Sequence, residues 1–202
     1  RERLNELLTD LCGARLTTNY TRIGGVSQDL PENWLDKLKE IIKIVPEALK
    51  DVDKLLTRNG IFMDRTIDVG KISKEDAISY AYTGPCLRAC GVDYDLRKSN
   101  PYLVYDDLDF DIPVDDNGDI YSRYIVRMEE MWQSLRIIEQ CIDKIPDGPV
   151  NIDDPSVTLP EKEDVYNKME SMIRQFKIIT DGIRPPAGTI YSATESPNGE
   201  LG

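Results

Sequence analysis

The spacing of hydrophobic residues predicts a chain that is built mainly from helices. In residues 1–12 the apolar side chains recur in steps of three and four, which is typical of one face of an amphipathic helix, and they are Leu4, Leu7, Leu8 and Leu11. Gly13 follows them and is expected to end this helix. A second apolar stripe starts near Glu32 and resumes after Pro46, which should kink or restart the helix.

The longest predicted helix runs from about Asp119 to Ile145, and a short helix capped by Ser73 runs to about Tyr80. At 1.5 Å per residue the long helix would measure roughly 40 Å. Its apolar side chains repeat in steps of four and three, a pattern typical of core packing. They are Ile120, Tyr124, Met128, Met131, Leu135, Ile138, Ile142 and Ile145.

A proline-rich connector over 146–160 separates this helix from a last predicted helix over about 161–180. The side chains of the last helix that are predicted to face inward are Val165, Met169, Met172, Ile173 and Phe176. The expected result is an antiparallel pair formed by the two helices.

Strand signals are few. Residues 110–114 alternate as a short strand, and residues 189–194 read as another. Pro197-Asn198-Gly199 is a hairpin-turn signal, but only three residues follow it, so the returning strand is predicted to be missing. Together with an uncapped first helix, this pattern favours the interpretation that 1–202 is an internal fragment of one domain, without its N-terminal and C-terminal parts.

The segment 84–102 stands out because its glycines and prolines disfavour an ordinary helix or strand. Gly84-Pro85 and Gly91 indicate turns, and Asn100-Pro101 closes the segment. Arg88 and Arg97 are predicted to hold its irregular backbone by bonding carbonyl and carboxylate oxygens. On this pattern alone, a structural loop held by arginines is the simpler interpretation, since buried loops need such donors merely to satisfy their backbone groups.

Composition excludes several classes of partner. The chain has 37 acidic and 25 basic residues, a net charge of −12, and 40% hydrophobic residues. Nucleic acid is therefore not an expected partner, because its phosphates require a basic surface. No apolar run approaches the roughly 20 residues of a membrane helix, so a soluble or peripheral protein is expected. No signal peptide is visible, and four irregularly spaced cysteines indicate a reducing compartment.

The absence of histidine excludes histidine-dependent nucleophiles and histidine-ligated metals or haem. The four cysteines form no CxxC pair, so buried thiols are expected and a metal site is not. The DDNGD sequence that ends at Asp119 does not fit a calcium loop, because Pro113 and Tyr124 would occupy positions that need a carboxylate. Gly24-Gly25 lacks the context of a dinucleotide-binding fingerprint.

Four motifs together resemble one family over the whole chain. They are TRIGGVSQDLP at 21–31, the segment 84–102, NGDIYSRYIVRMEEMWQSLRIIEQC at 117–141 and PPAGTIYSATESPNGELG at 185–202. The family is the 49 kDa subunit, or D-type subunit, of respiratory NADH:quinone oxidoreductase, complex I. The large subunits of membrane-bound nickel-iron hydrogenases share its fold. The resemblance therefore implies a mainly α protein, a helical bundle similar to the nickel-iron hydrogenase large subunit, with minor β-hairpin elements.

The resemblance also implies a place in an electron-transfer chain. In this family the protein packs against the subunit that carries the terminal iron-sulfur cluster, and together they enclose the headgroup of a quinone. Other expected partners are the 30 kDa-type subunit and the quinone-channel membrane subunit, on the cytoplasmic side of the bacterial inner membrane. The fragment itself is expected to bind no cofactor or metal. Many members carry a histidine near the cluster where this chain has Thr17, a departure that would fit a lower-potential quinone such as menaquinone.

The resemblance assigns no catalytic residue, because the headgroup-contacting residues of the family belong to segments ahead of residue 1. Ten matched residues are expected to form the interface beside the cluster and to support the quinone chamber: Arg22, Gly24, Gly25, Gln28, Asp29, Arg88, Gly91, Asp95, Arg97 and Tyr102. Two alternatives stay open, a relative in a hydrogenase-type complex and a scaffold module without quinone chemistry. The hydrogenase large subunits hold nickel with two cysteine pairs, and this chain shows neither.

Overall fold

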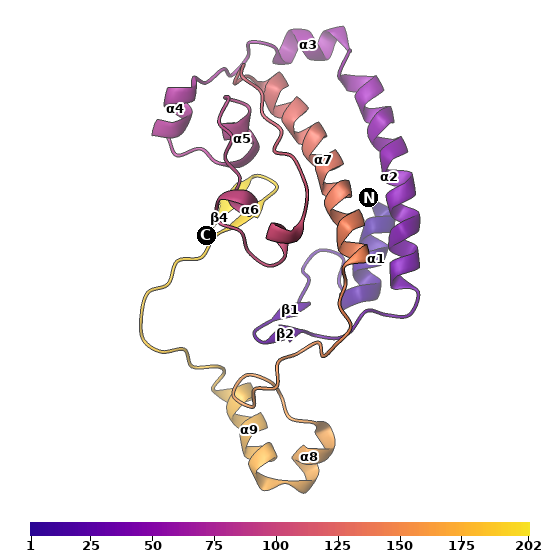
Figure 1. Cartoon of the computed structure of the whole chain (residues 1–202), viewed down its shortest axis with the longest axis vertical. Coiled ribbons are helices and arrows are strands. Elements are labelled where there is room, and N and C mark those ends of the chain that lie inside the picture. The colour runs from indigo at the N-terminus through magenta and orange to yellow at the C-terminus, as the bar shows by residue number, and fades with distance from the viewer. The chain divides into compact units, whose positions relative to one another are not determined.

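A computed structural model describes all residues from 1 to 202 and shows a mainly helical chain with two small antiparallel hairpins (Figure 1). The chain divides into two compact units. Unit 1 comprises residues 1–41 and 146–189, and unit 2 comprises residues 42–145 and 190–202. The predicted mainly α class is therefore confirmed, whereas the specific similarity to the hydrogenase large subunit stays a prediction.

Unit 1 begins with helix α1, Glu2–Cys12, as the leucine spacing predicts. Gly13 ends the helix with a left-handed φ of 75°, and its N–H donates a hydrogen bond to the carbonyl of Thr9. This position suits glycine because a side chain disfavours positive φ. Leu7 is buried, and its carbonyl accepts a hydrogen bond from the indole N–H of Trp34 at 3.0 Å.

The hairpin of unit 1 consists of β1, Thr21–Arg22, and β2, Gly25–Val26. The 146–160 connector runs along this hairpin and hydrogen-bonds to it. The N–H of Val26 donates to the carbonyl of Val150, and that of Ile152 donates to the carbonyl of Gly24. These bonds tie two segments together that lie more than a hundred positions apart in the sequence.

Helix α2, Trp34–Leu56, begins in unit 1 and continues into unit 2. It is one helix across Pro46, so of the two effects predicted there the restart is wrong, and the kink stays a prediction. The buried residues Ile41, Ile42 and Leu49 continue one apolar stripe across the proline. Packing of this stripe compensates for the backbone hydrogen bond that proline removes.

Unit 2 contains several short helices before its long one. Helix α3, Gly60–Thr66, has no counterpart among the predicted elements. Helix α4, Lys74–Ser79, is capped by the Ser73 hydroxyl, which accepts from the N–H of Asp76 at 3.1 Å, and this short helix is confirmed.

The segment 84–102 is not wholly irregular, which corrects the prediction. It contains helix α5, Gly84–Arg88, and helix α6, Leu96–Ser99, and it leads to the 3-10 turn η1, Tyr105–Asp107. Pro85 stands in the first turn of α5, where its missing N–H would have no intrahelical partner in any case. Proline and glycine therefore start and end short helices here and do not exclude them.

Helix α7, Ile120–Asp143, is the longest element, and its predicted bounds are confirmed to within two residues. Asp119 caps it by accepting a hydrogen bond from the N–H of Ser122 at 2.7 Å. Its predicted inner face is only partly correct. Met128 is buried, but Ile120 and Met131 are exposed, and Val126 and Ile137 are buried instead.

The strand predicted over 110–114 is wrong, because this segment is extended but pairs with no strand. Its backbone is bound by glutamine side chains of α7. The N–H of Asp109 donates to Gln140, and the N–H of Asp111 donates to Gln133. The alternation in the sequence arises because Phe110 packs inward with Ile137.

The helix predicted over 161–180 is two helices, α8, Lys162–Asn167, and α9, Met169–Thr180. Lys168 separates them with an extended backbone (φ −126°, ψ 122°). The inward orientation predicted for Met169, Met172, Ile173 and Phe176 is wrong, since all four are exposed. The sequence also predicts that the 161–180 helix pairs with the long helix. Helices α8 and α9 belong to unit 1 and α7 belongs to unit 2, so neither unit contains this pair.

The second hairpin belongs to unit 2 and corrects another prediction. Strand β3, Thr194–Ser196, pairs antiparallel with β4, Gly199–Leu201. The returning strand therefore exists within the last residues of the chain, and the first strand lies at 194–196 and not at 189–194. None of the helices combines the length and the apolar character needed to cross a membrane.

Candidate functional site

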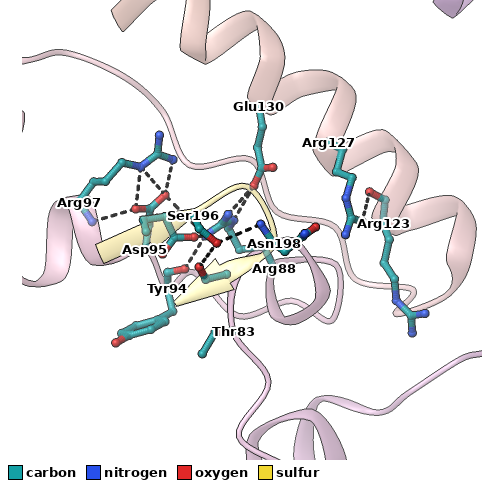
Figure 2. Close-up of polar contacts among 12 residues, drawn as sticks. Thr83, Arg88, Tyr94, Asp95, Arg97, Arg123, Arg127, Glu130, Ser196 and Asn198 are labelled. Atoms are coloured by element: carbon teal, nitrogen blue, oxygen red, sulfur yellow. Dashed lines mark hydrogen bonds and ion pairs between the residues drawn. The ribbon is translucent and has the colours of Figure 1, made fainter. Parts of the chain in front are cut away.

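Arg88, the last residue of α5, lies at the centre of a buried ionic network in unit 2 (Figure 2). Only 1% of its surface is exposed. Its Nε donates to Oε1 of Glu130 on α7 at 2.9 Å, and its Nη1 donates to Oε1 of Glu195 on β3 at 3.0 Å. Nη1 also donates to the carbonyl of Tyr94 at 3.0 Å and lies 3.5 Å from Oδ2 of Asp95. One guanidinium therefore joins three carboxylates from three elements.

Asp95 extends the network to a second guanidinium. Its Oδ1 accepts from the backbone N–H of Arg97, which caps α6, and its Oδ2 accepts from Nη2 of Arg97 at 2.6 Å. Burial raises the pKa of the Asp95 carboxyl, but the hydrogen bonds from Arg97 and the charge of Arg88 outweigh it and lower the pKa below its usual value. Asp95 is therefore held as a carboxylate although its side chain is buried.

Aromatic rings enclose the outer end of the network. The Arg97 guanidinium lies 4.9 Å from the ring centroid of Phe110, and Tyr105 meets Tyr102 edge to face with centroids 5.0 Å apart. Burial and the neighbouring Tyr102 raise the pKa of the Tyr105 phenol. Each cation–π contact of this kind contributes about 0.5–2 kcal/mol, depending on how far water is excluded.

The β3–β4 hairpin fits against α5 with almost no space between the backbones. A Cβ placed on Gly84 would lie 2.4 Å from Cα of Gly199, and one on Gly199 would lie 2.4 Å from Oγ1 of Thr83. The Thr83 hydroxyl also accepts from the N–H of Glu200 at 3.0 Å. The side chain of Glu195 reaches Arg88 only because the hairpin approaches this closely.

The network carries one excess negative charge, because three carboxylates face two guanidiniums. The side chains of Arg88, Asp95 and Glu195 are almost completely shielded from water, and those of Arg97 and Glu130 are mostly shielded. A buried charge is costly unless it is paired and hydrogen-bonded. Every member here has at least one ionic partner. The arrangement can hold a loop in one shape, and it contains no pair of nucleophile and base.

The five predicted residues of unit 1 lie on and beside the β1–β2 hairpin. Gly25 needs to be glycine, since its φ is 152° and a Cβ would lie 2.2 Å from the carbonyl oxygen of Val150. The Gln28 amide donates to the carbonyl of Leu11 at 2.6 Å. Asp29 accepts from the N–H of the next residue, and Arg22 is exposed on β1 without an ion pair.

The ten predicted residues therefore divide equally between the units. In unit 2, Arg88, Asp95 and Arg97 belong to one network. Tyr102 joins it through its hydroxyl, which accepts from the backbone N–H of Glu195 at 3.1 Å. Gly91 contacts a different segment, since a Cβ there would lie 2.6 Å from Oδ1 of Asp116.

Glu130 and Glu195 are network members that the sequence did not reveal. The 84–102 segment itself offers two other acidic residues near the arginines, Asp93 and Asp95, and of these Asp93 is exposed and takes no part. The only signal was the charge balance, because a buried and a half-buried guanidinium together need more acceptors than Asp95 supplies. That signal does not indicate which distant glutamates provide them.

The cysteines are all free thiols. Cys90 is buried, and burial is the main cause that raises the pKa of its thiol. Cys12, Cys86 and Cys141 are half-buried, so the prediction of buried thiols holds for Cys90 alone. No three histidine, cysteine or acidic side chains are grouped so that they could hold a metal ion. The residues present therefore do not fit the ligand set of an iron-sulfur cluster.

Comparison with known proteins places the whole chain in one family model, described as respiratory-chain NADH dehydrogenase, 49 Kd subunit, which matches residues 1–202. A D-type NADH-quinone oxidoreductase subunit of Myxococcus xanthus is 52% identical over 202 residues, which are 100% of this chain and 49% of that protein. The corresponding C/D-type protein of Bdellovibrio bacteriovorus is 51% identical over 100% of this chain and 36% of its own length. The D-type protein of Rickettsia bellii is 45% identical over 100% and 52%. The chain spans about half the length of most of these curated relatives.

Proposed function

The chain belongs to the family of the 49 kDa subunit of respiratory-chain NADH dehydrogenase, and we propose that it forms part of a proton-translocating NADH:quinone oxidoreductase. In this proposal it helps to form the quinone-reduction chamber beside the subunit that carries the terminal iron-sulfur cluster. The carrying observation is the identity of 45–52% over every residue of the chain to proteins named as subunits of this oxidoreductase. The hydrogenase alternative has no such support.

The contribution of this chain is positional. The buried network around Arg88 holds the 84–102 segment against α7 and the β3–β4 hairpin at fixed distances. A supporting surface of this kind matters, because displacing a reacting group by about 1 Å can reduce a rate on the order of a hundredfold. The proposal therefore gives Arg88, Asp95, Arg97 and Tyr102 the role of keeping the surface that faces the cluster-bearing subunit in shape.

The hairpin of unit 1 has a separate role in the proposal. Gly24 and Gly25 let the 150–152 segment approach the hairpin backbone. The Arg22 side chain on the same hairpin is exposed and is proposed to meet a partner. Gln28 and Asp29 fix the chain that follows the hairpin. This surface is proposed to contact another subunit of the complex.

In the proposal, quinone and the iron-sulfur cluster are bound in the assembled complex and not by residues 1–202 alone. The cluster would supply the electrons and the quinone would accept them. Other proposed partners are the 30 kDa-type and quinone-channel subunits. The proposed site of action is peripheral, on the cytoplasmic side of the bacterial inner membrane, and menaquinone remains the quinone suggested by Thr17.

The proposal is tested with a chimera in which residues 1–202 replace the aligned part of the Myxococcus xanthus relative. We expect membranes that contain the chimera to reduce quinone with NADH. A chimera that assembles with the other subunits and has no activity would contradict the proposal. The Gly188→Ala chimera is the control, because a Cβ on Gly188 would have no other atom within 4 Å. The isolated chain is expected neither to oxidise NADH nor to bind quinone tightly.

A further inference from the structure

The apolar side of helix α9 is exposed. Its apolar residues are spaced by three or four positions and form one face, and between 43% and 70% of the surface of each is exposed: Met169, Met172, Ile173, Phe176 and Ile179. These five residues are called the α9 apolar face. An amphipathic helix of a folded protein normally turns such a face inward.

The opposite side of α9 is the side that packs. Ser171 is the buried residue of the helix, and Gln175 and Ile178 are half-buried. Helix α8 contacts α9, but it is only six residues long, and its Tyr166 is itself exposed. The packed side of α9 is thus narrow, with one buried and two half-buried residues, and the α9 apolar face is left without cover from α8.

A surface of this kind needs an occupant, because soluble proteins rarely expose a contiguous apolar patch without a partner. The length of the relatives favours a segment of the same polypeptide as this occupant. The Myxococcus xanthus and Rickettsia bellii relatives match this chain over only 49% and 52% of their lengths, so about as many residues again belong to the same polypeptide. A covalently connected segment is present at a high effective concentration. The net charge of −12 disfavours an anionic lipid surface as the occupant.

We propose that the α9 apolar face is the docking surface for a further segment of the same polypeptide, from the part of the relatives' length that residues 1–202 do not span. The complementary segment would be apolar and would cover Met169, Met172 and Phe176 together. The proposal needs only the family membership of the chain, so it can fail or hold independently of quinone reduction.

The first experiment compares methionine oxidation in the isolated chain and in the chimera with the Myxococcus xanthus relative. Dilute peroxide is added, and sulfoxide formation at Met169 and Met172 is followed by mass spectrometry. We expect oxidation at both positions to be about tenfold or more slower in the chimera, since oxidation follows exposure. Met128, which is buried in unit 2, is the reference and should oxidise slowly in both proteins.

The second experiment places a charge on the same face. Phe176→Glu should leave the melting temperature of the isolated chain nearly unchanged and lower that of the chimera by several degrees, because the charge would be buried without a partner. Arg174→Glu is the matched control, since Arg174 is exposed on α9 and is not part of the α9 apolar face. It should shift neither protein appreciably.

Several results would overturn the proposal. Equal oxidation of Met169 in both proteins, or an unchanged melting temperature for the Phe176→Glu chimera, would show that no segment of the polypeptide covers the face. Protection in the isolated chain would assign the face to residues within 1–202 if it is independent of concentration, and to a second copy if it is lost on dilution. Protection only in the assembled complex would assign the face to a separate subunit.

Discussion

The network around Arg88 and the α9 apolar face differ in how their side chains meet water. In the first, charged side chains are buried, and Arg88, Asp95 and Glu195 all find partners within unit 2. In the second, apolar side chains such as Met169 and Phe176 are exposed, and nothing in unit 1 covers them. A polar group that leaves water needs a partner with defined geometry, whereas an apolar group needs only to be covered. The network is therefore complete within this chain, and the α9 apolar face is completed from outside it.

This difference predicts where substitutions will matter in the isolated chain. Changes in the network should destabilise unit 2 strongly, and changes on α9 should have little effect. The two tryptophans allow the units to be followed separately, because Trp34 lies in unit 1 and Trp132 lies on α7 in unit 2. A Trp34→Phe background reports unit 2, and a Trp132→Phe background reports unit 1.

The largest effect is expected for Arg88→Met. The substitution leaves the buried carboxylate of Glu195 and the partly buried one of Glu130 without their guanidinium, which should reduce the free energy of unfolding of unit 2 by about 3–5 kcal/mol. Arg88→Lys should be intermediate, because one ammonium cannot reach all the partners of a guanidinium. Urea unfolding followed by Trp132 fluorescence measures both. An Arg88→Met variant within about 0.5 kcal/mol of the parent would show that the network does not stabilise unit 2.

Gly199→Ala tests the contact between the hairpin and α5. Gly199 has a φ of 127°, and a Cβ there would lie 2.4 Å from Oγ1 of Thr83. Strain and steric overlap should together cost about 2–3 kcal/mol and loosen β3–β4. Hydrogen exchange of the hairpin amides should accelerate while that of α7 changes less. The matched control is Gly188→Ala, which should not destabilise the chain, and equal behaviour of the two variants would refute the close fit.

Local signals in the sequence predicted the elements whose causes are local. The leucine spacing and Gly13 predict α1, and Ser73 predicts α4, because caps and periodic faces act within a few residues. The signals failed where the partner is distant. The segment 110–114 alternates like a strand but is bound by glutamines of α7, and Pro46 does not interrupt α2, because tertiary packing overrides local preference.

The candidate site shows the same limit. Arg88 and Arg97 could be selected from their loop, and their bonding to carbonyl and carboxylate oxygens is confirmed. Glu195 could not, because its contact with Arg88 depends on a hairpin more than a hundred residues away. The orientation of α9 was also beyond local reasoning, since periodicity identifies an apolar face without identifying what covers it.

A smaller effect that depends on pH is expected for Asp95→Asn. At neutral pH the variant loses the ionic bonds to Arg97, which should cost about 1–3 kcal/mol. The pKa of Asp95 is lowered in the folded chain, so its charge stabilises the fold above the unfolded pKa of 3.8, and this contribution disappears as pH falls below 3.8. The difference in unfolding free energy between parent and variant should therefore shrink below about pH 4. A difference that is constant from pH 7 to pH 3 would mean that the charge of Asp95 is not stabilising.

The smallest effect is expected for Phe176→Gln in the isolated chain. The side chain of Phe176 is 64% exposed, so replacing it by a polar side chain of good helix propensity removes little buried surface. The free energy of unfolding of unit 1, followed by Trp34 fluorescence, should change by less than about 0.5 kcal/mol. An aromatic residue at a helical core position would instead cost about 3–5 kcal/mol on truncation. A large loss for Phe176→Gln would therefore show that α9 is already covered within residues 1–202, and the contrast between the buried network and the exposed face would no longer hold.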